Sequence, residues 1–342
     1  MTELVRKYTV CIKCMTFNHA SYIEDAMNGF TMQQTDFPFV CIIVDDASTD
    51  GEQDVIRQYL SNQFNLEDNN VVRQEETDDY YLTHAQHKTN LNCYFTVFLL
   101  KYNHYKKKAK GPYFKEWTEN VKYVAMCEGD DYWTDPLKLQ KQIDFLGNHT
   151  DYSMCFHRAA TLDYIGNGSW LRCFDIEDRD YSSDELFSKW IVPTNSIVYR
   201  SECLDYPIIH RERILNGDIV VVLSCSHTGK VRGMSDYMSV YRIQPGGLTY
   251  DPLIQKERTL KYPEHFECIQ ENFPLLSKDV IEHAIGTHYY YRSLIQTDIK
   301  LQKKDLLKAK LLFPEFIKQK KRELRKQHLK RILHFPINIV SA

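Results

Sequence analysis

Short apolar runs alternate with amphipathic stretches of helical length from the start of the chain to about residue 150. The runs at 8–15, 39–44 and 123–127 are continuously apolar and rich in β-formers, so we expect three buried strands there. Apolar residues recur at helical spacing over 21–32, which predicts a helix between the first two runs. Buried strands that alternate with helices are typical of an α/β domain with a mainly parallel sheet.

Three further helices are predicted in the same part of the chain. One covers 52–60, and either Ser48 or Thr49 can serve as its N-cap. The pattern over 91–102 also predicts a helix. The third covers 136–146 and opens with a proline, a residue that is common at the first helical position.

Two adjacent carboxylates, Asp45 and Asp46, follow the second predicted strand. Ligands of open α/β sheets bind at the carboxyl ends of the strands. A carboxylate in this position can accept hydrogen bonds from a base N–H or from ribose hydroxyls. The alternative is a strand–turn–helix corner, with Asp50 and Gly51 in the turn and Ser48 as the cap. That alternative does not explain two like charges side by side, which repel each other unless something binds them.

Three more carboxylates, Glu128, Asp130 and Asp131, follow the third predicted strand. Hard divalent cations prefer oxygen ligands, and Mg²⁺ sites usually combine one or two carboxylates with substrate phosphates. A cation held here would neutralise a departing diphosphate. The alternative is an acidic turn that caps the helix at Pro136, but a second acidic strand end favours the cation.

Asp218 precedes a very apolar segment at 219–223. It can cap the helix that we expect there, since Asp is a common N-cap. A helix N-terminus also keeps a carboxylate ionised, and an ionised Asp beside a site can remove a proton from an attacking hydroxyl. The residue pattern alone leaves both interpretations open.

The remainder of the chain has a different pattern. Residues 231–242 are typical of two short strands, and the chain is expected to be helical from 253 onward. Lys and Arg far outnumber acidic residues over 300–335, and Pro314 separates two expected helices there. A basic amphipathic helix can bind an anionic membrane. The alternative is that its apolar face packs on the protein and its charges are solvated.

Composition excludes several classes of protein. The chain has 342 residues and a net charge of −3, so there is no global basic signal and we expect no nucleic-acid partner. Its ten cysteines form no disulfide pattern, and we expect Cys11 and Cys14 to be buried thiols rather than metal ligands. Without a signal peptide or a membrane-spanning stretch, the chain is expected to be cytoplasmic.

Four segments resemble family 2 glycosyltransferases of the GT-A fold, and most of all the bacterial branch that builds cell-surface polysaccharide. The segments are CMTFNHASYIEDAMNGFTMQQ, IIVDDASTDG, CEGDDYWTDPLKLQKQIDFL and NGDIVVVLSCSHTGKVRGMSDYMSVYR. The resemblance implies an α/β, GT-A type nucleotide-binding sheet flanked by helices, with a C-terminal helical extension. We expect a nucleotide-sugar-binding half at 1–135, an acceptor-binding half at 136–250 and a helical, basic region at 251–342.

The resemblance also implies roles for individual residues. It places the nucleotide at Thr16, Phe17, Asn18, Asp45, Asp46, Glu128 and Asp130. Phe17 would stack on the base, Asp130 and Asp131 would hold Mg²⁺ or Mn²⁺, and Asp218 would be the general base. The implied reaction is one inverting displacement, in which an acceptor hydroxyl attacks the anomeric carbon of a nucleotide sugar, expected to be a UDP-sugar.

Three departures from the family pattern stand out. Glu128 replaces the first Asp of the metal motif, and Gln244 stands where many members carry a His that helps to hold the metal or the diphosphate. A basic, aromatic insert at 103–120 is atypical, and it would either cover the site as a lid or contact the acceptor. The motif of processive members, Gln-x-x-Arg-Trp, does not occur, so transfer of one sugar per encounter is expected.

Two other functions are compatible with this fold. A sugar nucleotidyltransferase would share the nucleotide domain and the metal carboxylates, but it would usually show a Gly-rich loop where this chain has residues 15–19. A non-catalytic binding protein is supported only by Glu128 and Gln244. The partners that we expect are a nucleotide-sugar donor, a glycan acceptor that is either free or lipid-linked, and an anionic surface on the inner face of the cell membrane.

Overall fold

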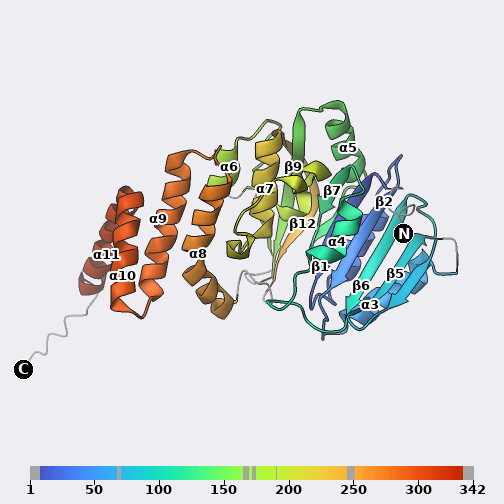
Figure 1. Ribbon diagram of the computed structural model, residues 1–342, viewed down its shortest axis with the longest axis horizontal. Helices are drawn as coiled ribbons and strands as arrows, with labels where there is room; N and C mark the ends of the chain where they lie inside the picture. The colour runs from blue at the N-terminus through green and yellow to red at the C-terminus, as the bar shows by residue number, and fades with distance from the viewer. Residues whose placement is uncertain are drawn as a thin grey trace, which may run out of the picture. The chain divides into compact units, whose positions relative to one another are not determined.

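The computed structural model describes residues 8–67, 71–164, 169–171, 175–189, 191–244 and 251–333, with only the backbone at 169–171 and 325–333 (Figure 1). The chain divides into two compact units. The first unit comprises Met1–Pro207 and Asp218–Gly247, and the second comprises Ile208–Gly217 and Leu248–Ala342.

The first unit is built on one mixed sheet, which has twelve strands among the described residues. The path through the sheet is β3-β5-β6-β2-β1-β7-β11-β9-β12-β8, while β4 pairs with β5 and β10 with β9. The strands are β1 Val10–Thr16, β2 Phe39–Asp45, β3 Phe64–Asn65, β4 Arg73–Glu76, β5 Tyr80–His87, β6 Cys93–Leu100, β7 Tyr123–Met126, β8 Tyr132–Trp133, β9 Tyr152–Asp163, β10 Ser169–Leu171, β11 Val198–Arg200 and β12 Lys230–Ile243. Strands β6, β2, β1 and β7 run parallel and form the centre of the sheet.

Helices cover both faces of this sheet. They are α2 Ile23–Thr31, α3 Glu52–Gln63, α4 Gly111–Thr118, α5 Lys138–Asn148, α6 Ser183–Lys189 and α7 Gly217–Thr228, with short 3-10 turns at Thr194–Ser196 and Ser201–Asp205. Apolar residues of α2, α3 and α5 form one core cluster with one face of the sheet. Residues of α4, α6 and α7 form a second cluster with the other face. Every position of β2 is buried, because successive side chains enter alternate clusters.

The α/β architecture and the strands expected at 8–15, 39–44 and 123–127 are confirmed, with small shifts of their ends. The helix expected at 91–102 is wrong, since Cys93–Leu100 is strand β6 between β5 and β2. All eight of its residues are buried, so the segment is apolar on both faces and carries no alternation that would reveal a strand. The two short strands expected at 231–242 are one long irregular strand, β12.

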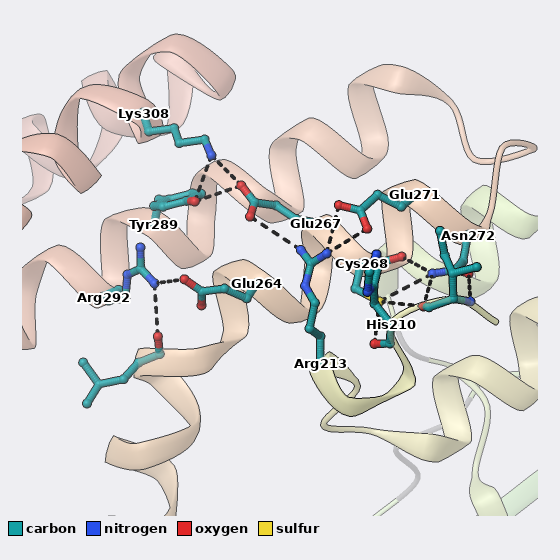
Figure 2. Close-up of polar contacts among 12 residues, drawn as sticks. His210, Arg213, Glu264, Glu267, Cys268, Glu271, Asn272, Tyr289, Arg292 and Lys308 are labelled. Atoms are coloured by element: carbon teal, nitrogen blue, oxygen red, sulfur yellow. Dashed lines mark hydrogen bonds and ion pairs between the residues drawn. The ribbon is translucent and has the colours of Figure 1, made fainter.

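The second unit is helical, as expected for a C-terminal extension. It contains α8 Pro252–Asn272, α9 Lys278–Ile295, α10 Ile299–Leu312 and α11 Pro314–Leu333, with a short turn at Arg211–Arg213. Ion pairs connect these elements: Arg213 binds Glu271, Lys308 binds Glu267, and Arg292 binds Glu264 (Figure 2). Arg292 also binds Asp305 of α10. Among the described residues, no helix is both long enough and apolar enough to span a membrane.

Candidate functional site

The predicted site residues of the first half converge where three parallel strands end. Thr16 at the end of β1 lies opposite Asp45 at the end of β2. The loop after β7 returns to the same edge, since the Gly129 amide donates to the Met15 carbonyl over 2.9 Å. This is the expected location of a ligand site in a sheet whose central strands are parallel.

A glycine allows the acidic loop to lie against β1. A Cβ atom added at Gly129 would come within 2.2 Å of the Thr16 hydroxyl oxygen, far inside van der Waals contact. Any larger residue would therefore push the two loops apart. The glycine within the Glu128–Asp131 segment thus has a packing reason as well as a place in a sequence motif.

The two carboxylate oxygens of Asp45 differ in their hydrogen bonding. Its Oδ1 accepts hydrogen bonds from the Ser48 amide, over 3.1 Å, and from the Gln53 side chain. Its Oδ2 is buried and has no hydrogen-bond partner among the described residues. Burial raises the pKa of Asp45, against the hydrogen bonds that lower it. A buried oxygen without a donor is costly, so this atom is suited to an N–H or O–H group of a ligand.

Asp46 is bound by the insert that the sequence marked as atypical. Lys110 Nζ lies 2.6 Å from Asp46 Oδ2, and the His104 amide donates to Oδ1 over 2.7 Å. The Asn103 side chain donates to the Asp46 carbonyl over 3.0 Å. Part of the insert is helix α4, which buries Phe114 in the core. The insert is therefore anchored on one of the predicted nucleotide ligands.

The loop after β1 is organised by a carboxylate that the sequence analysis did not single out. Glu52 is fully buried at the start of α3 and accepts hydrogen bonds from the Thr16 hydroxyl, the His19 amide and the Ser48 hydroxyl. Only the tertiary fold brings these groups together. Thr16 is thus held inside the site, and its hydroxyl is already engaged.

Two further loop residues differ in their surroundings. Phe17 has 42% of its surface exposed, which suits a ring that stacks on a ligand. Asn18 adopts a left-handed backbone with φ of 57°, and its side-chain oxygen accepts from the Thr49 amide over 2.8 Å. Left-handed non-glycine residues are uncommon and occur often at ligand sites.

The acidic loop is fixed by β12. The Arg242 amide donates to Asp131 Oδ1 and its guanidinium donates to the Asp130 carbonyl, both over 2.8 Å. The same guanidinium binds Asp25 of α2. Gln244 donates to Asp130 Oδ2 over 3.0 Å, so the residue that departs from the family pattern does lie at the predicted metal carboxylate.

Negative charge accumulates in this loop. Glu128 reaches solvent but is closely surrounded by protein, and this desolvation together with Asp130 and Asp218 raises its pKa to about 8. Burial and the neighbouring Asp130 raise the pKa of Asp131 well above its usual value. Asp218, in the first turn of α7, is therefore within electrostatic range of Glu128.

The carboxylates fit a divalent cation in charge and in chemistry. A cation would stabilise the ionised forms that crowding disfavours. Among the described residues, no group of three acidic, imidazole or thiol side chains is placed to hold a metal ion by itself. A Mg²⁺-type site needs only one or two protein ligands, because water and substrate phosphates complete it.

The raised pKa of Glu128 predicts how the stability of the metal-free protein depends on pH. Between about pH 4.5 and 8 the folded chain keeps a proton on Glu128 that the unfolded chain has lost. The resulting stabilisation is complete below pH 4.5 and is lost as the pH rises to 8. In EDTA, the melting temperature of wild type should therefore fall more between pH 5 and pH 9 than the melting temperature of Glu128→Gln. Equal falls would contradict the raised pKa.

Cys11 and Cys14 lie in β1 and are buried, as expected. Cys14 belongs to one core cluster and Cys11 to the other, because residues three apart in a strand point to opposite faces. Burial raises the pKa of both thiols. Their side chains point away from each other and are placed for packing.

Comparisons of the sequence with known proteins point to glycosyltransferases. Residues 11–82 match the family model for Glycosyl transferase family 2. Uncharacterized protein Mb1547 of Mycobacterium bovis is 29% identical over 256 residues, which are 72% of this chain and 62% of that protein. An uncharacterized glycosyltransferase of Nostoc, alr2836, is 24% identical over 236 residues, or 66% of this chain and 62% of the relative. The matches thus span less than two thirds of these relatives.

Solved structures show the same fold at low sequence identity. S. aureus TarS 1-349 in complex with UDP aligns with a TM-score of 0.52 at 15% identity, covering 90% of this chain and 82% of that one. The mannosyltransferase PcManGT from Pyrobaculum calidifontis, in complex with GDP-Man and Mn²⁺, aligns with a TM-score of 0.52 at 13% identity, covering 96% and 82%. Residues 11–82 thus match family 2 glycosyltransferases, and the first unit shares its α/β fold with solved GT-A glycosyltransferase structures.

Proposed function

We propose that the chain transfers one sugar, with inversion, from a nucleotide sugar to a glycan acceptor in bacterial capsule, lipopolysaccharide or exopolysaccharide synthesis. The observation that carries the proposal is the convergence of three groups at one sheet edge. These are the buried, partnerless Oδ2 of Asp45, the carboxylates of Asp130 and Asp131, and the Asp218 carboxylate beside Glu128.

In this proposal the nucleotide lies on the loops after β1 and β2. Asp45 Oδ2 accepts an N–H or O–H donor of the base or ribose, and Phe17 stacks on the base. Asp46 takes part through its charge and its anchored loop, since both of its carboxylate oxygens already accept hydrogen bonds. TarS was solved with UDP and UDP-GlcNAc, and PcManGT with GDP-Man, which supports a nucleotide-sugar donor. Both UDP- and GDP-sugars are therefore candidate donors.

Asp130 and Asp131 would hold Mg²⁺ or Mn²⁺, with Arg242 fixing the loop from behind. The cation supplies electrostatic stabilisation of the departing diphosphate. PcManGT was solved with Mn²⁺, which supports a divalent cation in this fold. Asp218 removes the proton from the acceptor hydroxyl as that hydroxyl attacks the anomeric carbon.

The proposal is tested by the release of nucleoside diphosphate. Purified full-length protein is incubated with a panel of UDP- and GDP-sugars, with Mn²⁺, Mg²⁺ or EDTA, and the diphosphate is measured. Release that depends on the cation is the expected result. Pyrophosphate formed from a sugar 1-phosphate and a nucleoside triphosphate would indicate a nucleotidyltransferase instead. No turnover of any donor, with tight nucleotide binding, would indicate a binding protein.

We also propose that the second unit binds an anionic membrane, which suits a lipid-linked acceptor and a location on the inner face of the cell membrane. Its tail residues divide into two groups. Phe313, Phe316 and Ile317 pack within the unit, and the Phe313 ring lies 3.8 Å from that of His283. Leu301, Leu307, Leu311 and Leu324 remain exposed. The side chains of Leu329, Ile332 and Leu333, and all residues after 333, lie outside the described part.

The exposed leucines of α10 share a face with lysines. Lys300, Lys303, Lys304 and Lys310 are exposed on the same helix as Leu307 and Leu311. Residues spaced by three, four and seven positions lie on one side of a helix. Leucines can enter the headgroup boundary while each lysine near it contributes about 1 kcal/mol.

The double variant Leu307→Ser/Leu311→Ser is expected to bind anionic vesicles at least about tenfold more weakly, because burying a leucine contributes about 1.5–3 kcal/mol. Co-sedimentation of the full-length chain with anionic and neutral vesicles measures this. Leu275→Ser, at the exposed turn between α8 and α9, is the matched control. Point variants are preferred to truncation, since Asp305 of α10 is buried in an ion pair with Arg292 of α9. Equal binding to neutral vesicles, or none at low salt, would contradict the proposal.

A further inference from the structure

We propose that His19 is a ligand of the divalent cation, in the role that the residue at position 244 would otherwise fill. The inference rests on the proposed metal-dependent function and adds a nitrogen ligand to it. Gln244 presents an amide to Asp130, where many family members have an imidazole. His19 presents an imidazole to the same carboxylate. It lies on the loop between β1 and α2, far from Gln244 in the sequence.

The separation between His19 and Asp130 leaves room for one cation between the two side chains. His19 Nε2 lies 3.7 Å from Asp130 Oδ2, which is too long for a hydrogen bond. With metal–ligand bonds of about 2.1 Å, adjacent ligands of an octahedral ion lie about 3 Å apart and opposite ligands about 4.2 Å apart. The observed 3.7 Å is a few tenths of an ångström from either spacing, so a small rotation of the His19 or Asp130 side chain would complete the geometry. Both side chains are only partly exposed, at 16% and 18%.

Hydrogen bonds through Thr16 favour the tautomer of a neutral His19 ring that carries its proton on Nδ1. The Thr16 hydroxyl donates its hydrogen to Glu52 Oε1. Its oxygen can then only accept from His19 Nδ1, which lies 3.1 Å away. In a neutral ring with its proton on Nδ1, the lone pair of Nε2 is directed toward the carboxylate of Asp130, and a cation between the two atoms would bind both.

This arrangement has the form of a typical imidazole metal site. Ligating histidines usually donate their other N–H to a group that fixes the tautomer and the ring orientation. Here the backbone of His19 is fixed as well, since its amide donates to Glu52 Oε2 over 2.8 Å. Glu52 therefore positions both the main chain and, through Thr16, the ring of His19.

The test uses full-length protein with Mn²⁺ and UDP, and electron paramagnetic resonance as the readout. Nitrogen-14 modulation from a bound imidazole is expected in wild type, and it should be lost in His19→Ala and His19→Gln. Loss of the ligand should also raise the dissociation constant for Mn²⁺ by at least about 10- to 100-fold. That is the usual cost of removing a residue that only supports a metal ligand, and a direct ligand should cost no less. His149→Ala, an exposed histidine elsewhere in the first unit, is the matched control and should retain both signals.

A second variant separates ligation from a structural effect. In the double variant His19→Ala/Gln244→His, an imidazole is offered to Asp130 from position 244, and the nitrogen signal and Mn²⁺ affinity should return. If wild type binds Mn²⁺ without an imidazole signal, or if the signal persists in His19→Ala, the assignment of His19 is wrong while the proposed function stands. If wild type binds no Mn²⁺ with UDP, the metal-dependent function itself is wrong.

Discussion

Asp218→Asn is expected to lower kcat by about 10²–10⁴-fold, the usual contribution of a general base, and to leave donor affinity unchanged. The amide keeps the shape of the carboxylate and can still accept from the Ile219 amide, which Asp218 Oδ1 contacts over 2.9 Å. It cannot take a proton from an acceptor hydroxyl. Steady-state kinetics of diphosphate release with a competent acceptor measure kcat, and titration with the donor measures affinity.

Asp236→Asn is the matched control for this variant. Asp236 lies in β12 with 60% of its side chain exposed, and it carries the same charge outside the candidate site. The kcat of Asp236→Asn should equal that of wild type. If Asp218→Asn also keeps the wild-type kcat, then Asp218 only supports the start of α7 and another base must be sought.

Asp130→Asn and Asp131→Asn should each abolish cation-dependent turnover, and wild type should lose turnover in EDTA. Asn retains the size of Asp and can still accept from Arg242 or Gln244, but it removes the charge that a hard cation requires. Because burial and Asp130 disfavour the charged form of Asp131, the metal-free Asp131→Asn protein should melt no lower than wild type. Diphosphate release and thermal melts with and without Mn²⁺ measure both effects. Full activity of both variants in EDTA would refute a metal role for these residues.

The sequence predicted the central sheet and the acidic clusters because each depends on a local pattern. A run that is apolar on both faces indicates a buried strand, and carboxylates after such a run indicate a ligand edge. The same reasoning failed for β6, where Cys93–Leu100 is equally apolar on both faces but was assigned to a helix. Periodicity does not distinguish a short buried strand from a buried helix, and only pairing with β5 and β2 decides it.

Several residues of the candidate site have no local signal. Glu52 lies far in sequence from Thr16 and His19, yet its carboxylate accepts hydrogen bonds from both residues. Lys110 lies 64 positions after Asp46 and binds its carboxylate. Such pairs arise from the packing of loops at the sheet edge, and a single sequence does not reveal which loops meet. Arg242 was contained in a recognised motif, but its contacts with the acidic loop became visible only in the fold.

The buried thiols of the first unit allow its unfolding to be followed by their reactivity. Five cysteines, Cys14, Cys41, Cys93, Cys127 and Cys155, belong to the core on one face of the sheet, and Cys11, Cys203 and Cys225 belong to the other. All are free and buried, so alkylation by a thiol reagent should require local or global unfolding. If the two faces open separately, mass spectrometry over time should show two groups of modified peptides with different rates. If the sheet unfolds as one cooperative body, all eight should react together.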